Sequence, residues 1–206
     1  RILDYFWTST PTADLAVVTT AGVELFLVLP ERRALKLVRN IVQHVSWCVY
    51  SHETRLLLLA TGQRDNHVHG VQVQPQAIVR IPRFEVQLAP MSSAAPPPAG
   101  QQLPRRSLQP SQLSVARLYT CIYAVHIEPE LRRIFLYQLF KDYVVRKHEL
   151  ELYSADVAVS AVDNLLLVHL RDARVVLLYD LRLNAHAPIS APLPLATLPT
   201  DGFGPT

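Results

Sequence analysis

Short apolar segments recur along almost the whole chain, and each is bounded by a turn or by a few polar residues. Most are rich in Val, Leu and Tyr, and strands favour β-branched and aromatic residues. They either alternate apolar with polar positions or stay apolar over about four to eight positions, whereas an amphipathic helix repeats apolar residues every three or four. The pattern therefore predicts an all-β protein built from short strands.

The predicted strands group into four units. In the first unit they cover 2–7, 14–20, 23–29 and 34–40. In the second they cover 45–50, 55–61 and 68–74, and the closing strand is either 77–81 or 84–88. In the third they cover 114–120, 121–127, 131–140 and 144–153, and in the fourth 157–162, 165–170 and 174–183, with the Pro-rich tail as a candidate edge strand.

Two places leave a choice open. Pro82 separates the two candidates for the closing strand of the second unit, and proline is tolerated in a sheet only at an edge or a bulge. Residues 132–144 partly fit a helical stripe, with apolar Ile134, Phe135, Leu139 and Val144. We favour strands there because Tyr, Phe and Val are strand formers and because the neighbouring units repeat.

The two tryptophans support a repeat, since Trp7 and Trp47 are 40 residues apart and each precedes a polar loop and a second apolar strand. Four strands in a period of about 40–45 residues are typical of a β-propeller blade. A β-sandwich is the alternative if the spacing is a coincidence. We therefore predict a partial, WD-repeat-like β-propeller of about four blades of four antiparallel strands, whose blades need neighbours stacked on each side.

Composition divides the chain into three parts. Residues 1–89 are expected to form two blades, and residues 112–206 further blades and a Pro-rich tail. Residues 90–111 are rich in Pro, Ala, Ser and Gln and poor in apolar anchors. Such a segment buries too little to offset its ordering entropy, so we predict a disordered loop rather than a proline-rich ligand for a groove domain.

Charge and hydropathy exclude several classes of protein. The net charge is only +3 and the Arg and Lys residues are scattered, so a nucleic-acid partner is not expected. No apolar run approaches the ~20 residues of a spanning helix, and no signal peptide is visible. The chain begins at Arg1 without an initiator Met, so we expect a piece of a longer protein.

Cys48 and Cys121, the two cysteines, each lie in an apolar run, and no C-x-x-C pair occurs. A secreted disulfide framework needs more cysteines in a shorter chain. We therefore expect free thiols in a reducing compartment.

Few residues suggest chemistry. His67 and His69 would share one face of a strand and can be imagined as metal ligands, although surface histidines beside a turn are the simpler interpretation. Glu149 and Glu151 also share a face, which fits a solvated strand better than a pair of catalytic carboxylates. Asp163, followed by Asn164, is typical of a turn. No nucleophile elbow, phosphate loop or zinc motif occurs, so no catalytic, cofactor-binding or metal-binding residue is assigned, and the interface residues are unknown.

Several stretches together resemble one family. They are ILDYFWTST at 2–10, GVELFLVLPERRALKLV at 22–38, VSWCVYS at 45–51, PRFEVQL at 82–88, AVDNLLLVH at 161–169 and VVLLYDLRL at 175–183. The most specific are the G-V-E strand leading into LPERRALKL and the VDNL…VH block with its downstream YDL strand. These blocks cover most of the chain outside 90–111, and they resemble the amino-terminal region of the regulators of the Mon–Ccz complex.

The resemblance implies an amino-terminal β-propeller followed by a helical solenoid in the complete protein. It implies a non-catalytic scaffold subunit without cofactors, whose propeller docks on the Mon and Ccz subunits of a guanine-nucleotide exchange complex. That complex activates the late-endosomal, Rab-seven-type GTPase, and so supports endosome maturation, lysosomal fusion and autophagy. The implied location is cytoplasmic and peripheral, on late endosome, lysosome and autophagosome membranes, through the complex. A propeller from another vesicle-trafficking or coat assembly is the alternative.

Overall fold

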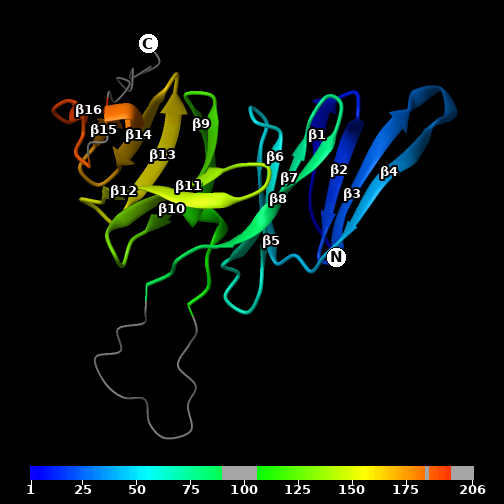
Figure 1. Cartoon of the computed structure of the whole chain (residues 1–206), viewed down its shortest axis with the longest axis horizontal. Helices are drawn as coiled ribbons and strands as arrows, with labels where there is room; N and C mark the ends of the chain where they lie inside the picture. The colour runs from blue at the N-terminus through cyan, green and yellow to red at the C-terminus, as the bar shows by residue number, and fades with distance from the viewer. Residues whose placement is uncertain (90–105, 184–185, 196–206) are drawn as a thin grey trace, which may run out of the picture.

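The chain forms four four-stranded antiparallel sheets, each made of consecutive strands (Figure 1). The computed structural model describes residues 1–89, 106–183 and 186–195. The first sheet contains β1 (Ile2–Thr10), β2 (Ala13–Thr19), β3 (Gly22–Leu29) and β4 (Ala34–Val42). The second contains β5 (Trp47–Ser51), β6 (Leu56–Thr61), β7 (His67–Val73) and β8 (Ile78–Glu85). The third contains β9 (Leu113–Leu118), β10 (Cys121–Glu128), β11 (Arg133–Leu139) and β12 (Val144–Glu151). The fourth contains β13 (Val157–Val162), β14 (Leu165–Leu170), β15 (Val175–Tyr179) and β16 (Leu193–Pro194). Three single 3-10 turns complete the described elements: η1 (Pro30–Arg32), η2 (Pro110–Gln112) and η3 (Leu181–Leu183).

The first strands of the four sheets lie along a common line. β1 contacts β5, β5 contacts β9, and β9 contacts β13, while the later strands of each sheet extend away from them (Figure 1). This is the arrangement of neighbouring propeller blades around an axis. The prediction of an all-β, partial propeller of four blades is therefore confirmed, and the four sheets form an open array.

Apolar side chains pack in clusters between neighbouring sheets. The best example is β6, whose residues 56–60 are all buried. Leu57 and Leu59 pack in the cluster between the first and second sheets, whereas Leu56 and Leu58 pack in the cluster between the second and third. Alternate residues of a strand point to opposite faces, so an uninterrupted leucine run fits a sheet that is covered on both sides.

The tryptophan pair does not mark the repeat. Trp47 is the first residue of β5, whereas Trp7 lies well inside β1, and the two side chains have different surroundings. Corresponding strands of the first and second sheets begin 43 to 45 residues apart. The first three strands of the third and fourth sheets begin 42 to 44 residues apart, and their last strands 49. The prediction that Trp7 and Trp47 occupy equivalent positions in two blades was therefore wrong. The recurrence of four strands in each unit is present.

β8 joins both candidate strands on either side of Pro82. Ile81 pairs with Gly70 and Phe84 pairs with Val68, with a register shift between these two pairs. Pro82 therefore lies in an edge strand and at a bulge, the two places where a missing N–H group is tolerated. The segment that competed as a helix forms β11 and β12, as predicted.

One predicted strand is shorter than expected. The chain leaves β15 at Tyr179, and Leu181–Leu183 form the turn η3 instead of continuing the strand. A carboxylate oxygen of Asp180 accepts hydrogen bonds from the Arg182 N–H (2.9 Å) and from the Tyr119 hydroxyl (2.7 Å). These bonds satisfy the backbone in a turn and attach it to the third sheet.

The segment predicted as a disordered loop is ordered where the structure describes it. Residues 90–105 lie outside the described residues, but Arg106 and Leu108 are fixed by several bonds. The Leu108 N–H donates to the Arg64 carbonyl (2.9 Å), and the Leu108 carbonyl accepts from the Trp47 indole (3.0 Å). Leu108 is completely buried, so this part of the segment has the apolar anchor that composition alone did not suggest.

Candidate functional site

The two histidines considered as metal ligands lie on β7, and both are half-buried. Within the described residues, no group of three or more His, Cys, Asp or Glu side chains is placed to hold a metal ion. Burial, followed by the positive charges of Arg83, Arg80 and His67, lowers the pKa of His69. The position of His69 is therefore electropositive, which disfavours a cation there.

The paired glutamates of β12 are held by one arginine. The Arg133 guanidinium contacts Glu149 at 3.1 Å and Glu151 at 3.0 Å, on the surface of the third sheet. Both carboxylates are therefore in contact with the same cation. This arrangement explains the spacing of two as an exposed ion-pair network.

Asp163 and Asn164 form the turn between β13 and β14, with Asp163 in the left-handed region at φ 53°. The Asn164 side-chain oxygen accepts a hydrogen bond of 2.7 Å from the Tyr119 N–H, in the turn between β9 and β10. The pair therefore joins the fourth sheet to the third.

Both cysteines are free thiols and are half-buried. Burial and then the charge of Asp4 raise the pKa of Cys48 to about 11, so its thiol stays protonated near neutral pH. A protonated thiol is a poor nucleophile, and this fits a packing role for Cys48.

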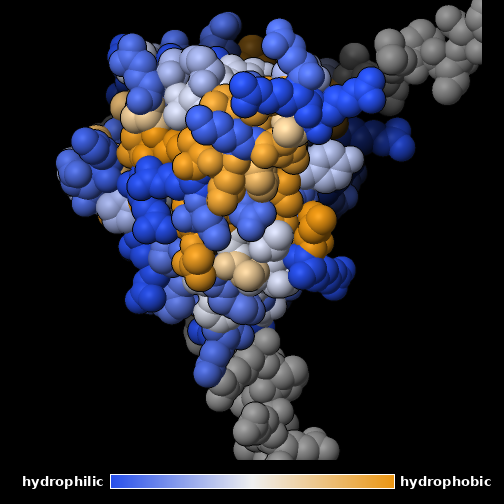
Figure 2. Space-filling view, turned by 90° about the vertical axis from the view of Figure 1, so that its right-hand side faces the viewer, coloured by the Kyte–Doolittle hydropathy of each residue, from blue (hydrophilic) through white to orange (hydrophobic). Residues whose placement is uncertain are grey.

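The outer face of the first sheet, which points away from the second sheet, is a large exposed apolar surface. Trp7, Leu15, Phe26 and Leu37 are cross-strand partners, so one apolar row crosses all four strands. Tyr5 lies beside this row and is 69% exposed, and Trp7 is 57% exposed. Figure 2 shows this side of the molecule, with a broad hydrophobic area bordered by hydrophilic side chains.

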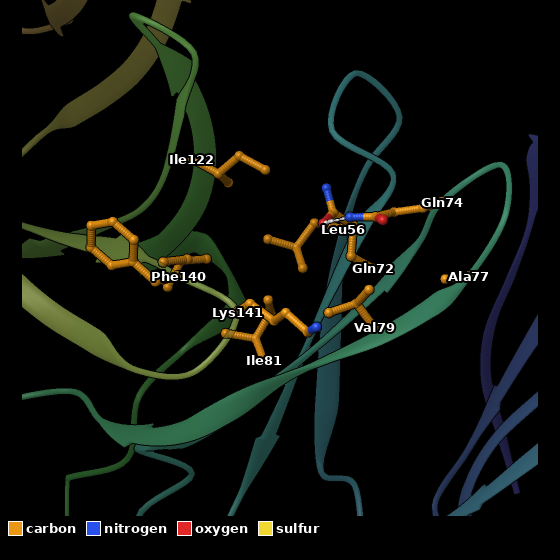
Figure 3. Close-up of a pocket in the computed structure, with 10 residues that line it drawn as sticks. Leu56, Gln72, Gln74, Ala77, Val79, Ile81, Ile122, Phe140 and Lys141 are labelled. Carbon is orange, nitrogen blue, oxygen red and sulfur yellow. Dashed lines mark hydrogen bonds between the residues drawn. The ribbon is translucent and has the colours of Figure 1, made fainter.

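A second candidate surface is a cavity of ≈ 330 Å³ between the second and third sheets (Figure 3). Leu56 and Ile122 point into it from the two opposing sheets, and Phe140 and Lys141 come from the loop after β11. Gln74 closes one side, where its amide nitrogen donates to the Gln72 side-chain oxygen at 2.9 Å. The cavity thus combines apolar walls with two amides and one ammonium group.

The cavity has one charged group among the described residues that line it, Lys141, and no Cys, Ser, His, Asp or Glu. It can accept an apolar side chain while Lys141 pairs with an acceptor at the opening. Sequence reasoning missed both surfaces because each is assembled from residues of several strands.

Comparisons with known proteins agree with the sequence motifs. The human protein "Regulator of MON1-CCZ1 complex" is 27% identical over 214 aligned positions, which cover 100% of this chain and 31% of the human protein. The mouse protein of the same name is 28% identical, covering 89% of this chain and 28% of the mouse protein. The chain therefore spans about a third of the length of these curated relatives.

Other comparisons add little. No protein-family model matches the chain. A crystal structure of a protein from Lactobacillus plantarum is 13% identical, with a TM-score of 0.49, and the match covers 94% of this chain and 56% of the other. A likeness this distant says nothing about activity. The resemblance predicted from the sequence blocks is confirmed by the curated relatives: along nearly its whole length, this chain is similar to the regulators of the Mon–Ccz complex.

Proposed function

We propose that this chain is part of a non-catalytic scaffold subunit of the Mon–Ccz guanine-nucleotide exchange complex. The observation that carries the proposal is the similarity, along the whole chain, to the human and mouse regulators of that complex. The names of these relatives indicate a regulatory subunit, which fits a protein without enzymatic activity of its own.

In this proposal the propeller-like array docks on the Mon and Ccz subunits. The complex then activates the late-endosomal, Rab-seven-type GTPase, and through it supports endosome maturation, lysosomal fusion and autophagy. The protein is cytoplasmic and reaches late endosome, lysosome and autophagosome membranes through the complex. Among the described residues, no helix combines the length and the apolar character needed to span a bilayer.

Co-purification tests the proposal. The tagged full-length protein that contains this chain is expected to recover both Mon and Ccz from cells, at constant proportions after a salt wash. Alone it is expected to release no labelled GDP from the Rab-seven-type GTPase, whereas the recovered complex is expected to do so. Recovery of neither subunit would contradict the proposal. Recovery of a coat or tethering assembly instead would support the alternative of a propeller from another trafficking complex.

A further inference from the structure

A basic cleft lies between the first and second sheets. It has a volume of ≈ 380 Å³, and its walls come from the end of β4, from β7 and from β8. Arg80, Arg83 and His69 line it, and Arg39 of β4 reaches β8, where its guanidinium donates to the Ile78 carbonyl at 3.4 Å. We call the cavity with Arg80, Arg83 and His69 the arginine cleft.

The β8 bulge gives the arginine cleft its shape. Val68 pairs with Phe84 and Gly70 pairs with Ile81, so the shift in register falls at His69 on one strand and at Pro82 and Arg83 on the other. A bulge redirects the side chains of the bulged strand. Here Arg80 and Arg83, both exposed, line the same cavity from either side of Pro82.

The positive charge of the cleft is not neutralised within the described residues. No Asp or Glu is among the residues that line the cavity, and Arg39, Arg80 and Arg83 take part in none of the ion pairs of the described chain. Glu85, also on β8, instead accepts a hydrogen bond from the Asn66 amide at 3.0 Å. The lowered pKa of His69, caused by burial and then by Arg83, Arg80 and His67, reflects the same field.

The other half of the lining is apolar. Ile41 and Val42 of β4 face Val71, Ile81 and Pro82 of the second sheet across the cavity. A ligand that fills this space therefore needs apolar groups beside its negative charge. We propose that the arginine cleft binds an acidic–apolar peptide segment of a partner protein, with its carboxylates on Arg80 and Arg83 and its apolar side chains between the two sheets.

Two features favour a peptide over a phosphate or a lipid headgroup. Arginine forks bind carboxylates as well as phosphates, so the charge alone does not decide. The apolar residues of the lining provide neither a hydrogen-bond donor nor a positive charge for a free phosphate. The cavity lies between two sheets, so a slender chain with alternating side chains fits it better than a flat membrane surface does.

Fluorescence anisotropy with two labelled pentapeptides tests the proposal on the purified protein. The probe is acetyl-Leu-Glu-Leu-Glu-Leu-amide, and its neutral partner carries Gln in place of both Glu residues. We expect binding of the acidic peptide only, weakened about tenfold or more by the double variant Arg80→Glu and Arg83→Glu. The same double variant is expected to bind acetyl-Leu-Lys-Leu-Lys-Leu-amide, which the unmodified protein does not bind.

A matched control separates the cleft from net charge. The double variant Arg32→Glu and Arg117→Glu changes the net charge equally, at exposed positions outside the cleft, and is expected to keep full affinity. In the unmodified protein, the bound carboxylates are expected to raise the pKa of His69, measured by NMR of its imidazole ring. Circular dichroism verifies that each variant is folded.

Three results would overturn the proposal. The first is equal binding of the acidic and neutral peptides. The second is equal loss of affinity in the cleft variant and in the control variant. The third is binding of vesicles that contain anionic phospholipid through Arg80 and Arg83 without any binding of the peptide, which would make the cleft a membrane contact instead.

Discussion

Glu128, at the end of β10, is a fully buried carboxylate that contacts three donor groups. Its oxygens contact the Arg106 guanidinium at 2.7 Å and accept hydrogen bonds from the N–H groups of Ala89 and Glu130, both at 3.2 Å. Removing one partner of a buried pair leaves the other charge without compensation. Since the Arg106 side chain is 21% exposed, water offsets part of that cost.

Glu128→Ala is expected to lower the free energy of unfolding by about 3 kcal/mol, measured by urea denaturation. Arg171→Ala is the control, because the ion pair of Arg171 with Asp156 joins side chains that are 60% and 57% exposed. It is expected to cost less than about 1 kcal/mol. Equal losses in the two variants would contradict a special contribution from the buried pair.

His126 predicts a pH dependence of stability. It is completely buried, neither ring nitrogen has a hydrogen-bond partner among the described residues, and burial, followed by the charge of Arg106, lowers its pKa from 6.5 to about 4. Between these values the unfolded chain binds more protons than the folded one, so stability falls as the pH falls from 6.5 to 4. Above pH 6.5 the His126 ring is neutral in both the folded and the unfolded chain, so it costs no stability there.

The loss attributable to His126 is at most about 3 kcal/mol. His126→Phe removes the titrating group and is expected to flatten the dependence over this range. Urea midpoints are compared for the two proteins at several pH values. The carboxylates are the same in both, so their effect on stability cancels in the difference. Identical slopes for both proteins would mean that His126 binds its proton equally in the folded and unfolded states, and would contradict the prediction.

At the scale of single elements, the β7–β8 hairpin depends on Gly70. A Cβ atom added there would lie 2.7 Å from Ile81 Cβ and 2.8 Å from Ile81 Cγ1, closer than packed atoms approach. Gly70→Ala is therefore expected to cost about 1–3 kcal/mol in chemical denaturation, the range for overpacked cores. In a background of Ile81→Gly the same change is expected to cost much less, because both contacting atoms, Cβ and Cγ1, are gone. An equal cost in both backgrounds would indicate a backbone effect.

A strand or turn could be predicted from the sequence when the residues that determine it lie within its own segment. β6 was evident because four leucines in a row need a sheet buried on both faces. β8 stayed open because Pro82 marks both a strand end and a bulge, and only the register with β7 distinguishes them. η3 was missed because Asp180 ends the strand through a bond to Tyr119 on another sheet.

The candidate surfaces were harder to predict than the strands. Ile41 and Arg80 come from different sheets, and nothing in their spacing indicates that they line the same cavity. Tyr5, Trp7 and Leu37 likewise meet on one face only through the pairing of β1 to β4. Sequence periodicity can assign a residue to a face of its strand, but the neighbours across sheets follow from the packing.

At the scale of the whole molecule, the outer face of the first sheet predicts self-association of the isolated chain. Soluble monomers rarely expose apolar patches as extended as this row across four strands. The triple variant Tyr5→Ser, Trp7→Ser and Leu37→Ser is expected to reduce concentration-dependent association in sedimentation velocity and to bind less of a hydrophobic dye.

The control for this prediction replaces scattered exposed residues instead. Leu131→Ser, Tyr153→Ser and Leu183→Ser remove a comparable set of exposed apolar side chains without altering the outer face. Association is expected to persist in this variant. A chain that is monomeric at all concentrations before any substitution would contradict the prediction.

The two oxygens of the Glu128 carboxylate bring Ala89 and Arg106 to nearly the same point in space. Ala89 follows β8 of the second sheet and Arg106 precedes β9 of the third, so both ends of the connection between these sheets are held at one carboxylate. For a flexible loop with fixed ends, each doubling of the length adds only about 0.6 kcal/mol to the free energy of closing the loop. The connection between Ala89 and Arg106 is therefore a suitable place to insert a fluorescent reporter or an affinity tag, because both of its ends stay bound to Glu128.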